Sequence, residues 1–180
     1  MEPLPRRLLL ASRLLLILSG PLIAAAVVCA VGGFAAADEI AARLMARVLA
    51  EIDAETLAGL PPDFLTASTV QRAAVALAVG FLSLGLGQLA TAIGLRRRAR
   101  WSYAAAVMGG LFVAFACGAS AIFMMAATSR QPQAALVLTV GAIGLGGVAI
   151  LYGAIAGLTA AGRRELEVAG RAAGEERSAG

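Results

Sequence analysis

The stretch Arg96-Arg97-Arg98-Ala99-Arg100-Trp101 decides the fold prediction, because it places four arginines between two long apolar runs. The flanking runs, residues 73–95 and 101–128, each exceed the roughly 20 apolar residues that a helix needs to cross a bilayer. Loops on the cytoplasmic side of a membrane carry an excess of arginine and lysine. The stretch therefore predicts a cytoplasmic turn between two transmembrane helices, with Trp101 at the membrane interface.

The composition of the whole chain agrees with this local pattern. Of 180 residues, 60% are hydrophobic and only 14% are charged, and the mean hydropathy is +0.85. Such values are typical of a polytopic membrane protein and exclude an ordinary soluble globule. All the basic residues are arginine, and the chain is rich in alanine and glycine, which favours a bacterial source. Membrane topology accounts for the net charge of +4, so we expect no nucleic-acid partner.

We expect an all-α integral membrane protein, with four transmembrane helices in a bundle and an amphipathic helix between the first two. The spans are predicted at residues 14–37, 73–95, 101–128 and 134–161. The connecting segments are predicted as a cytoplasmic N-terminus (1–13), a periplasmic segment (38–72), a basic cytoplasmic loop (96–100), a periplasmic turn (129–133) and a cytoplasmic tail (162–180). The tail is expected to be helical at first and then frayed. Eleven of the fifteen arginines then lie inside, which predicts a bacterial inner membrane location with both termini cytoplasmic.

The first apolar run has a second interpretation, as a cleaved signal peptide. Ala35-Ala36-Ala37 before Asp38 resembles a small-residue cleavage site. The run is about 24 residues long, however, whereas the apolar part of a signal peptide has roughly 7 to 15. We therefore favour a retained first span.

Residues 38–59 show a different, helical charge pattern. Charged residues recur at every fourth position and stack along one helical face: Glu39, Arg43, Arg47, Glu51 and Glu55. The pattern predicts an amphipathic helix that ends at Pro61-Pro62 and lies on the outer surface or continues the first span outward. A solvated face is the favoured interpretation, and docking of a partner is an alternative. A metal site formed by Glu51, Asp53 and Glu55 lacks a nearby histidine or cysteine.

Spans two and four share a short pattern. Residues 85–90 followed by Gly94 match residues 144–149 followed by Gly153 at a fixed offset. Either the two-helix unit is duplicated, or the match reflects the glycine, leucine and alanine that dominate both segments. The same residues fit a G-x-G-x-x-A string, but no strand precedes it, so we do not interpret it as a dinucleotide motif.

Small residues form two ridges at helical spacing. Gly110, Ala114 and Gly118, preceded by Ala106, form one ridge on the third span, and Gly153 and Gly157 form a G-x-x-x-G pair on the fourth. Small residues allow transmembrane helices to approach closely. Both ridges are predicted to be helix-packing seams, whose partner is either another helix of this chain or another subunit.

Polar residues are rare inside the predicted spans. Counting about 1.5 Å per residue from the cytoplasmic ends puts Gln88 at roughly 10 Å and Tyr152 at roughly 14 Å depth. They are predicted to form a structural hydrogen bond or, with Thr91, a small polar binding site. Cys29 and Cys117 fall at similar depths, roughly 22 and 24 Å, where small apolar packing is commoner than a disulfide.

The remaining composition limits the chemistry that the chain can perform. It contains no histidine, and no acidic residue or arginine lies well inside a span. Common nucleophile, zinc and haem sites and ion-coupled transport usually need such residues. We therefore expect no enzyme activity and no cofactor or metal, and instead an accessory, assembly or scaffold subunit of a membrane complex. Its partners would be the bilayer and other subunits or itself. The alternative is a small self-associating transporter or channel for a small solute.

Overall fold

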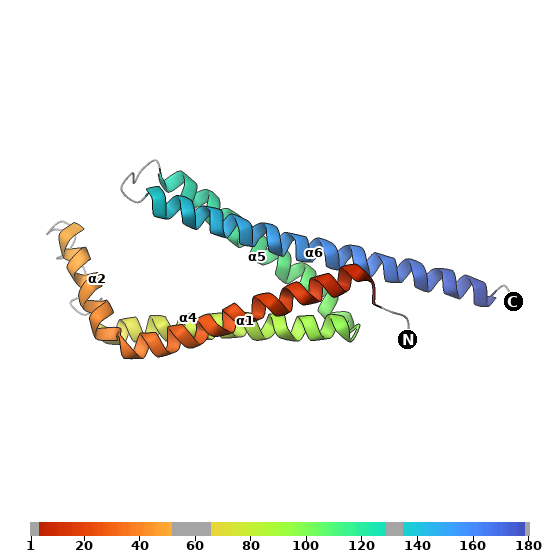
Figure 1. Ribbon diagram of the computed structural model, residues 1–180, viewed down its shortest axis with the longest axis horizontal. Helices are drawn as coiled ribbons and strands as arrows, with labels where there is room; N and C mark the ends of the chain where they lie inside the picture. Colours follow the sequence, from red (N-terminus) through yellow and green to blue (C-terminus); the bar gives the residue numbers. More distant parts are fainter. Residues whose placement is uncertain (1–3, 52–65, 129–134, 179–180) are drawn as a thin grey trace. The chain divides into compact units, whose positions relative to one another are not determined.

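The structure is a computed structural model that describes residues 4–51, 66–128 and 135–178. Five helices occupy these residues: α1 (Arg6–Ala35), α2 (Ala37–Glu51), α4 (Ala67–Arg96), α5 (Arg100–Thr128) and α6 (Ala135–Ser178) (Figure 1). All except α2 are long and apolar enough to cross a membrane. The prediction of a helical chain with four long apolar helices is thus confirmed. The expected helix end at Pro61-Pro62, and Asp53 and Glu55, lie outside the described residues.

Three of the four long helices extend several residues beyond the predicted spans at one end. α1 begins at Arg6 and takes in the N-terminal arginines, and α4 begins at Ala67 rather than at residue 73. The largest difference is in α6, whose 44 residues continue to Ser178 where we expected a fraying tail. At 1.5 Å per residue, α6 is roughly 66 Å long, about twice the thickness of a hydrocarbon core. Alanine, glutamate and arginine dominate its second half, and all three are strong helix formers.

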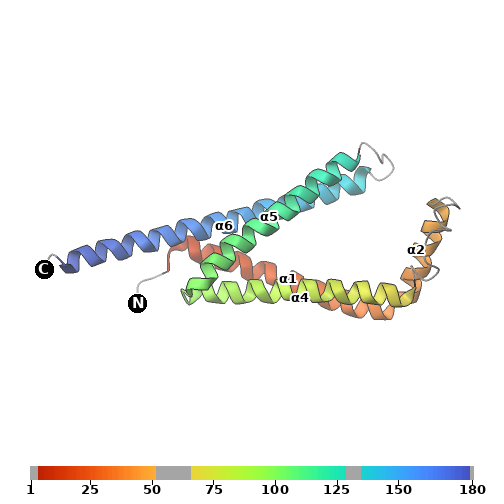
Figure 2. The same ribbon diagram turned by 180° about the vertical axis from the view of Figure 1, so that it is seen from behind.

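The chain divides into two compact units, and residues 18–87 form one of them. In this unit α1 and α4 approach closely, because a Cβ on Gly85 would lie 2.8 Å from Cγ1 of Ile23 and a Cβ on Gly33 would collide with Ala74. α2 leaves the axis of α1 at a bend at Ala36 (Figures 1 and 2). Backbone hydrogen bonds continue across the bend, so the change of direction does not interrupt the helical bonding.

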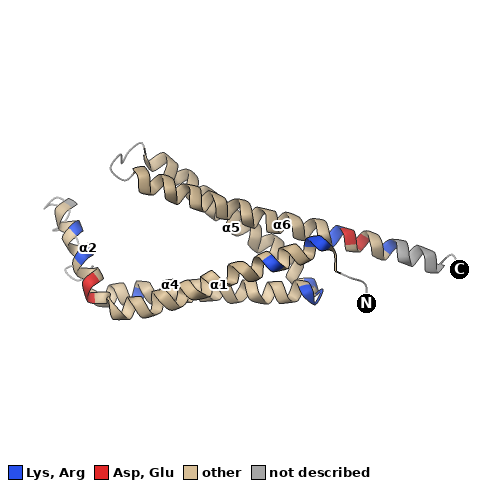
Figure 3. Cartoon of the chain, viewed as in Figure 1, with Lys and Arg blue, Asp and Glu red and all other residues tan. Residues whose placement is uncertain are grey.

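Residues 1–17 and 88–180 form the other unit. Here α5 and α6 form an antiparallel hairpin. The first turns of α1 and the last turns of α4 belong to the same unit. The largest fully buried side chains of the described residues all belong to this unit: Leu8, Leu95, Ile155, Thr159, Ser12 and Ser102. We call the region where they gather the basic end, because arginines surround it at the start of α1, the α4–α5 turn and the middle of α6 (Figure 3).

Candidate functional site

The polar residues predicted inside the spans include one directly bonded pair. The side-chain Nε2 of Gln88 on α4 donates a hydrogen bond to the hydroxyl of Tyr152 on α6. Both side chains are buried, with 9% and 6% of their surfaces exposed. Thr91 is buried one helical turn further along α4. The structure therefore brings Gln88 and Tyr152 together and places Thr91 on the same face of α4 as Gln88.

The amide of Gln88 is only half satisfied. Its Oε1 atom is buried and has no hydrogen-bond partner among the described residues. Because Oε1 and Nε2 are assigned from the hydrogen-bond network, exchanging them leaves the other amide atom without a partner instead. One polar atom of Gln88 is therefore available to a further group in either assignment.

The basic loop forms a tight turn between α4 and α5. The backbone N–H of Ala99 donates to the carbonyl of Gly94 at 2.9 Å, and that of Arg98 donates to Leu95 at 3.2 Å. This pair of bonds is the Schellman arrangement that ends a helix. Arg98 occupies its left-handed position with φ 56°, where glycine is usual.

Two neighbours of the turn explain why the helices can approach there. A Cβ on Gly94 would lie 2.7 Å from Cβ of Ser102, so α5 packs directly on the glycine backbone of α4. The Trp101 ring also lies against Gly94 and remains 53% exposed. Arg96, Arg97 and Arg100 are exposed around the turn. This arrangement fits the interfacial and topological roles that the sequence predicts for these residues.

Contacts with α1 hold the basic end together, and the sequence pattern did not predict them. Nε of Arg96 donates to Oγ of the buried Ser12 at 3.1 Å. A Cβ on Gly162 would lie 2.7 Å from Cγ of Leu8, so α1 packs on the backbone of α6. The only sequence signal for this packing is Ala11-Ser12, two small residues between Arg7 and Arg13. That pair alone does not identify a partner helix.

The two small-residue ridges occupy different environments. On α5, a Cβ on Gly110 would lie 3.0 Å from the Tyr152 carbonyl oxygen and 3.2 Å from Cβ of Ala156. Further along the same ridge, Ala114 is half-buried. A Cβ added to Gly118 would lie 3.9 Å from Cβ of Ala149 on α6. This ridge therefore faces α6.

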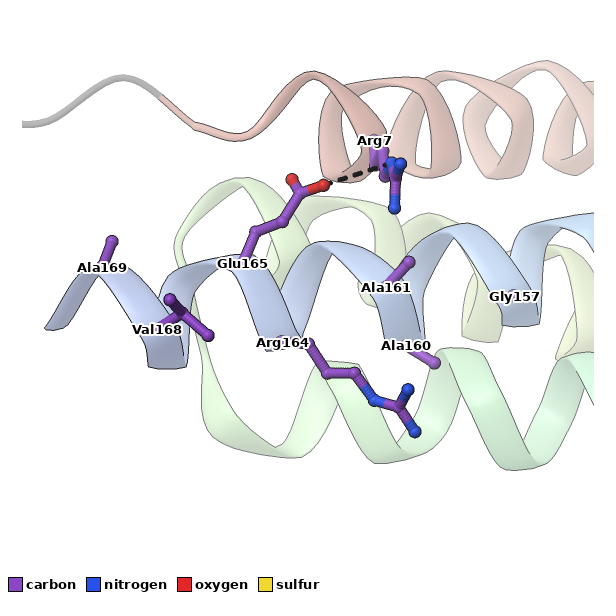
Figure 4. A pocket seen from close by; sticks show the side chains of 8 residues that line it. All are labelled: Arg7, Gly157, Ala160, Ala161, Arg164, Glu165, Val168 and Ala169. Carbon is purple, nitrogen blue, oxygen red and sulfur yellow. Dashed lines mark ion pairs between the residues drawn. The ribbon is translucent and has the colours of Figure 1, made fainter. Parts of the chain in front are cut away.

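The ridge on α6 does not face another described helix at close range. No atom lies within 4 Å of a Cβ built on either Gly153 or Gly157, and Gly157 is exposed. Gly157 lines an open groove of about 650 Å³ beside α6, together with Ala160, Ala161 and the side chain of Arg7 (Figure 4). An ion pair of 3.2 Å between Arg7 and Glu165 lies at the groove, and Arg164 extends away from that pair.

The other residues singled out from the sequence show no joint site. Cys29 and Cys117 are free, half-buried thiols that lie in different units. In α2, Arg43 pairs with Glu39 one turn earlier, on exposed side chains that contribute little stability. No cluster of histidine, cysteine or acidic residues with the makings of a metal site occurs within residues 4–51, 66–128 and 135–178.

Comparisons with protein-family models, curated proteins and solved structures find no match to this chain. The class of protein therefore follows from its own helices. Four of them are apolar over windows of at least 18 residues, and large side chains such as Phe115 and Leu136 are about four-fifths exposed. Exposed aromatic and aliphatic surface of this extent suits a lipid environment. The length and composition of the helices are those of a multi-pass membrane protein.

Proposed function

We propose that this protein is a non-catalytic accessory, assembly or scaffold subunit of a bacterial inner-membrane complex. The observation that supports the proposal is the open small-residue groove beside α6. Gly157, Ala160 and Ala161 present little side-chain bulk there, and no part of the described chain fills the space above Gly157. Within a bilayer, helices associate where small residues let their backbones approach. A helix of a partner subunit fits this groove.

The packed basic end supports the same role. Its buried side chains come from α1, α4, α5 and α6, so this end is a defined platform within the chain. In the proposed topology the platform and both termini lie on the cytoplasmic side, following the distribution of arginine. The groove at Gly157 adjoins this platform, through Arg7 and Glu165. A rigid platform beside an open helix groove is suited to hold a partner in a fixed position.

Substitution of Gly157 by leucine tests the proposal. The new side chain fills the groove without a clash inside the chain, because nothing lies within 4 Å of its Cβ. We expect Gly157→Leu to keep the stability of the isolated protein and to reduce recovery of a partner subunit after mild-detergent purification. Gly109→Leu on α5 is the matched control, since its Cβ position is equally open and lies outside the groove. Equal recovery of partners with both variants would contradict a docking role for the groove.

A small self-associating transporter or channel is the second candidate, and the unpartnered amide atom of Gln88 favours it. A buried polar atom without a partner is costly, and a small polar solute would satisfy it. In that case the protein forms a defined homo-oligomer, and Gln88→Leu abolishes solute flux in reconstituted vesicles. Unchanged flux in Gln88→Leu would eliminate this candidate.

A further inference from the structure

A second groove lies at the basic end, between α5 and α6. It consists of two adjoining hollows of about 440 and 450 Å³ that share Tyr103, Arg163 and Glu167. All its lining residues belong to the same compact unit. The groove adjoins the one at Gly157, with which it shares Ala160 and Arg164, but it opens towards α5 rather than towards α1.

Its lining changes from charged to apolar along the helices. Arg100 lies at the start of α5, whereas Val107 and Met108 lie about two turns further into the helix. On α6 the order is the same, with Arg163 and Arg164 at the basic end and Ala160 one turn further in. The distance along α5 from Arg100 to Met108 is about 12 Å at 1.5 Å per residue. The groove thus has a basic mouth and an apolar floor.

The mouth carries a net positive charge. Nε of Arg163 forms an ion pair of 2.8 Å with Glu167, the acidic residue that lines both hollows. Arg100 and Arg164 line the groove without an ion pair to any described residue. Two guanidinium groups are therefore available to an anion, and guanidinium binds phosphate through paired hydrogen bonds.

Tyr103 contributes a hydroxyl group to the lining of the groove. Its side chain is 92% buried, and it lines both hollows. No described residue forms a hydrogen bond with its hydroxyl. The hydroxyl oxygen is not among the fully buried atoms without a partner, so it remains accessible from the groove that Tyr103 lines. The hydroxyl therefore fits a ligand oxygen at the border between the basic mouth and the apolar floor.

We propose that this groove binds one anionic phospholipid. Its phosphate interacts with Arg100 and Arg164 and accepts a hydrogen bond from the Tyr103 hydroxyl, and one acyl chain lies along Ala104, Val107 and Met108. The order of charge, hydroxyl and apolar wall matches the order of headgroup, ester region and chain in a lipid. Basic pockets between membrane helices are known binding sites for acidic headgroups. This proposal depends on the membrane location and is independent of the accessory role.

Tryptophan quenching provides the test, because Trp101 is the only tryptophan and lies beside Arg100. The full protein is reconstituted into vesicles of unlabelled phosphatidylcholine. One set also contains phosphatidylglycerol with brominated acyl chains, and the other contains phosphatidylcholine with brominated acyl chains. We expect the brominated phosphatidylglycerol to quench more strongly at equal mole fraction. Arg164→Gln should lower the relative binding of phosphatidylglycerol about five-fold, the effect expected for one basic residue near an anionic lipid surface. Tyr103→Phe should lower it at least about ten-fold, as loss of one hydrogen bond to a charged group.

Arg13→Gln is the matched control, because Arg13 is an exposed arginine of α1 that does not line the groove. It should leave quenching unchanged. Arg164 is also exposed, so its substitution by glutamine leaves the buried core intact. Equal quenching by the two lipids, or equal losses with Arg13→Gln and Arg164→Gln, would overturn the proposal. Competition by millimolar inorganic phosphate would also overturn it, by showing that the site binds a soluble anion.

Discussion

The side-chain amide of Gln88 on α4 donates a hydrogen bond to the hydroxyl of Tyr152 on α6, 64 positions further along the chain. Both residues are buried, and the second polar atom of the amide has no partner among the described residues. The bond is thus a polar link between two apolar helices in one compact unit. Its two ends should respond differently to substitution.

Tyr152→Phe should destabilise the protein more than Gln88→Leu. The phenylalanine variant leaves both polar atoms of the buried Gln88 amide without a protein partner, whereas the leucine variant leaves only the Tyr152 hydroxyl without one. The coupling between the two sites should be about 0.6 kcal/mol, the average for hydrogen bonds between membrane helices. A double-mutant cycle of unfolding free energies in detergent micelles measures it. A larger loss for Gln88→Leu than for Tyr152→Phe would contradict the arrangement.

Gly110→Leu should separate α5 from α6. The added side chain begins 3.0 Å from the carbonyl oxygen of Tyr152, which cannot move without its helix. We expect a loss of about 1–3 kcal/mol, typical of overpacking. Gly109→Leu provides the comparison, because the neighbouring position is open. Thermal unfolding in detergent should therefore shift for Gly110→Leu alone, and equal shifts would show that this ridge does not contact α6.

Arg98→Gly should stabilise the α4–α5 turn. The left-handed conformation at φ 56° is unfavourable for a residue with a Cβ and costs glycine little. After subtraction of the larger entropy of unfolded glycine, we expect a gain of about 0.5–1 kcal/mol. Arg98→Ala removes the same charge but keeps the Cβ, so it should show no gain. If both variants gained equally, the effect would come from charge rather than from the backbone.

Single cysteines should reveal the orientation of the chain in the membrane. In a background where Cys29 and Cys117 are replaced by alanine, Ala46→Cys on α2 should react with an impermeant thiol reagent added to intact cells. Ala169→Cys on α6 should react only after the inner membrane is permeabilised. Both positions are exposed in the structure, so burial does not limit the reaction. The reversed pattern would invert the proposed topology.

The long helices were predictable, because uncharged runs of more than 20 residues have few structural alternatives. The pairing between their faces was not. Gly110 and Gly153 look equivalent in sequence, yet Gly110 contacts α6 and Gly153 is open. In a soluble helix the polar face would show which side is outward, but these helices are apolar on every side. Gly85 and Gly144, which correspond in the apparent repeat, differ in the same way, since only Gly85 contacts a neighbouring helix.

The contacts of the basic end were hidden for a related reason. Leu8 and Ser12 lie among the N-terminal arginines, a segment whose charges predicted a location at the membrane surface. In the structure the same segment supplies buried residues that contact Gly162 and Arg96. The arginines predicted on which side of the membrane the segment lies. They did not predict which of its faces is buried, because that depends on small residues in distant helices. The end of α6 was also difficult to predict, because no proline follows residue 161 to stop the helix.

The central claim, that this protein serves a larger membrane complex, is tested most directly by its stoichiometry in the native host. The tagged chain is purified in mild detergent, and native mass spectrometry measures the mass and composition of the intact assembly. The account predicts an assembly with a fixed ratio of this chain to at least one different membrane protein, and loss of that protein in Gly157→Leu. A discrete oligomer that contains only copies of this chain would contradict the claim.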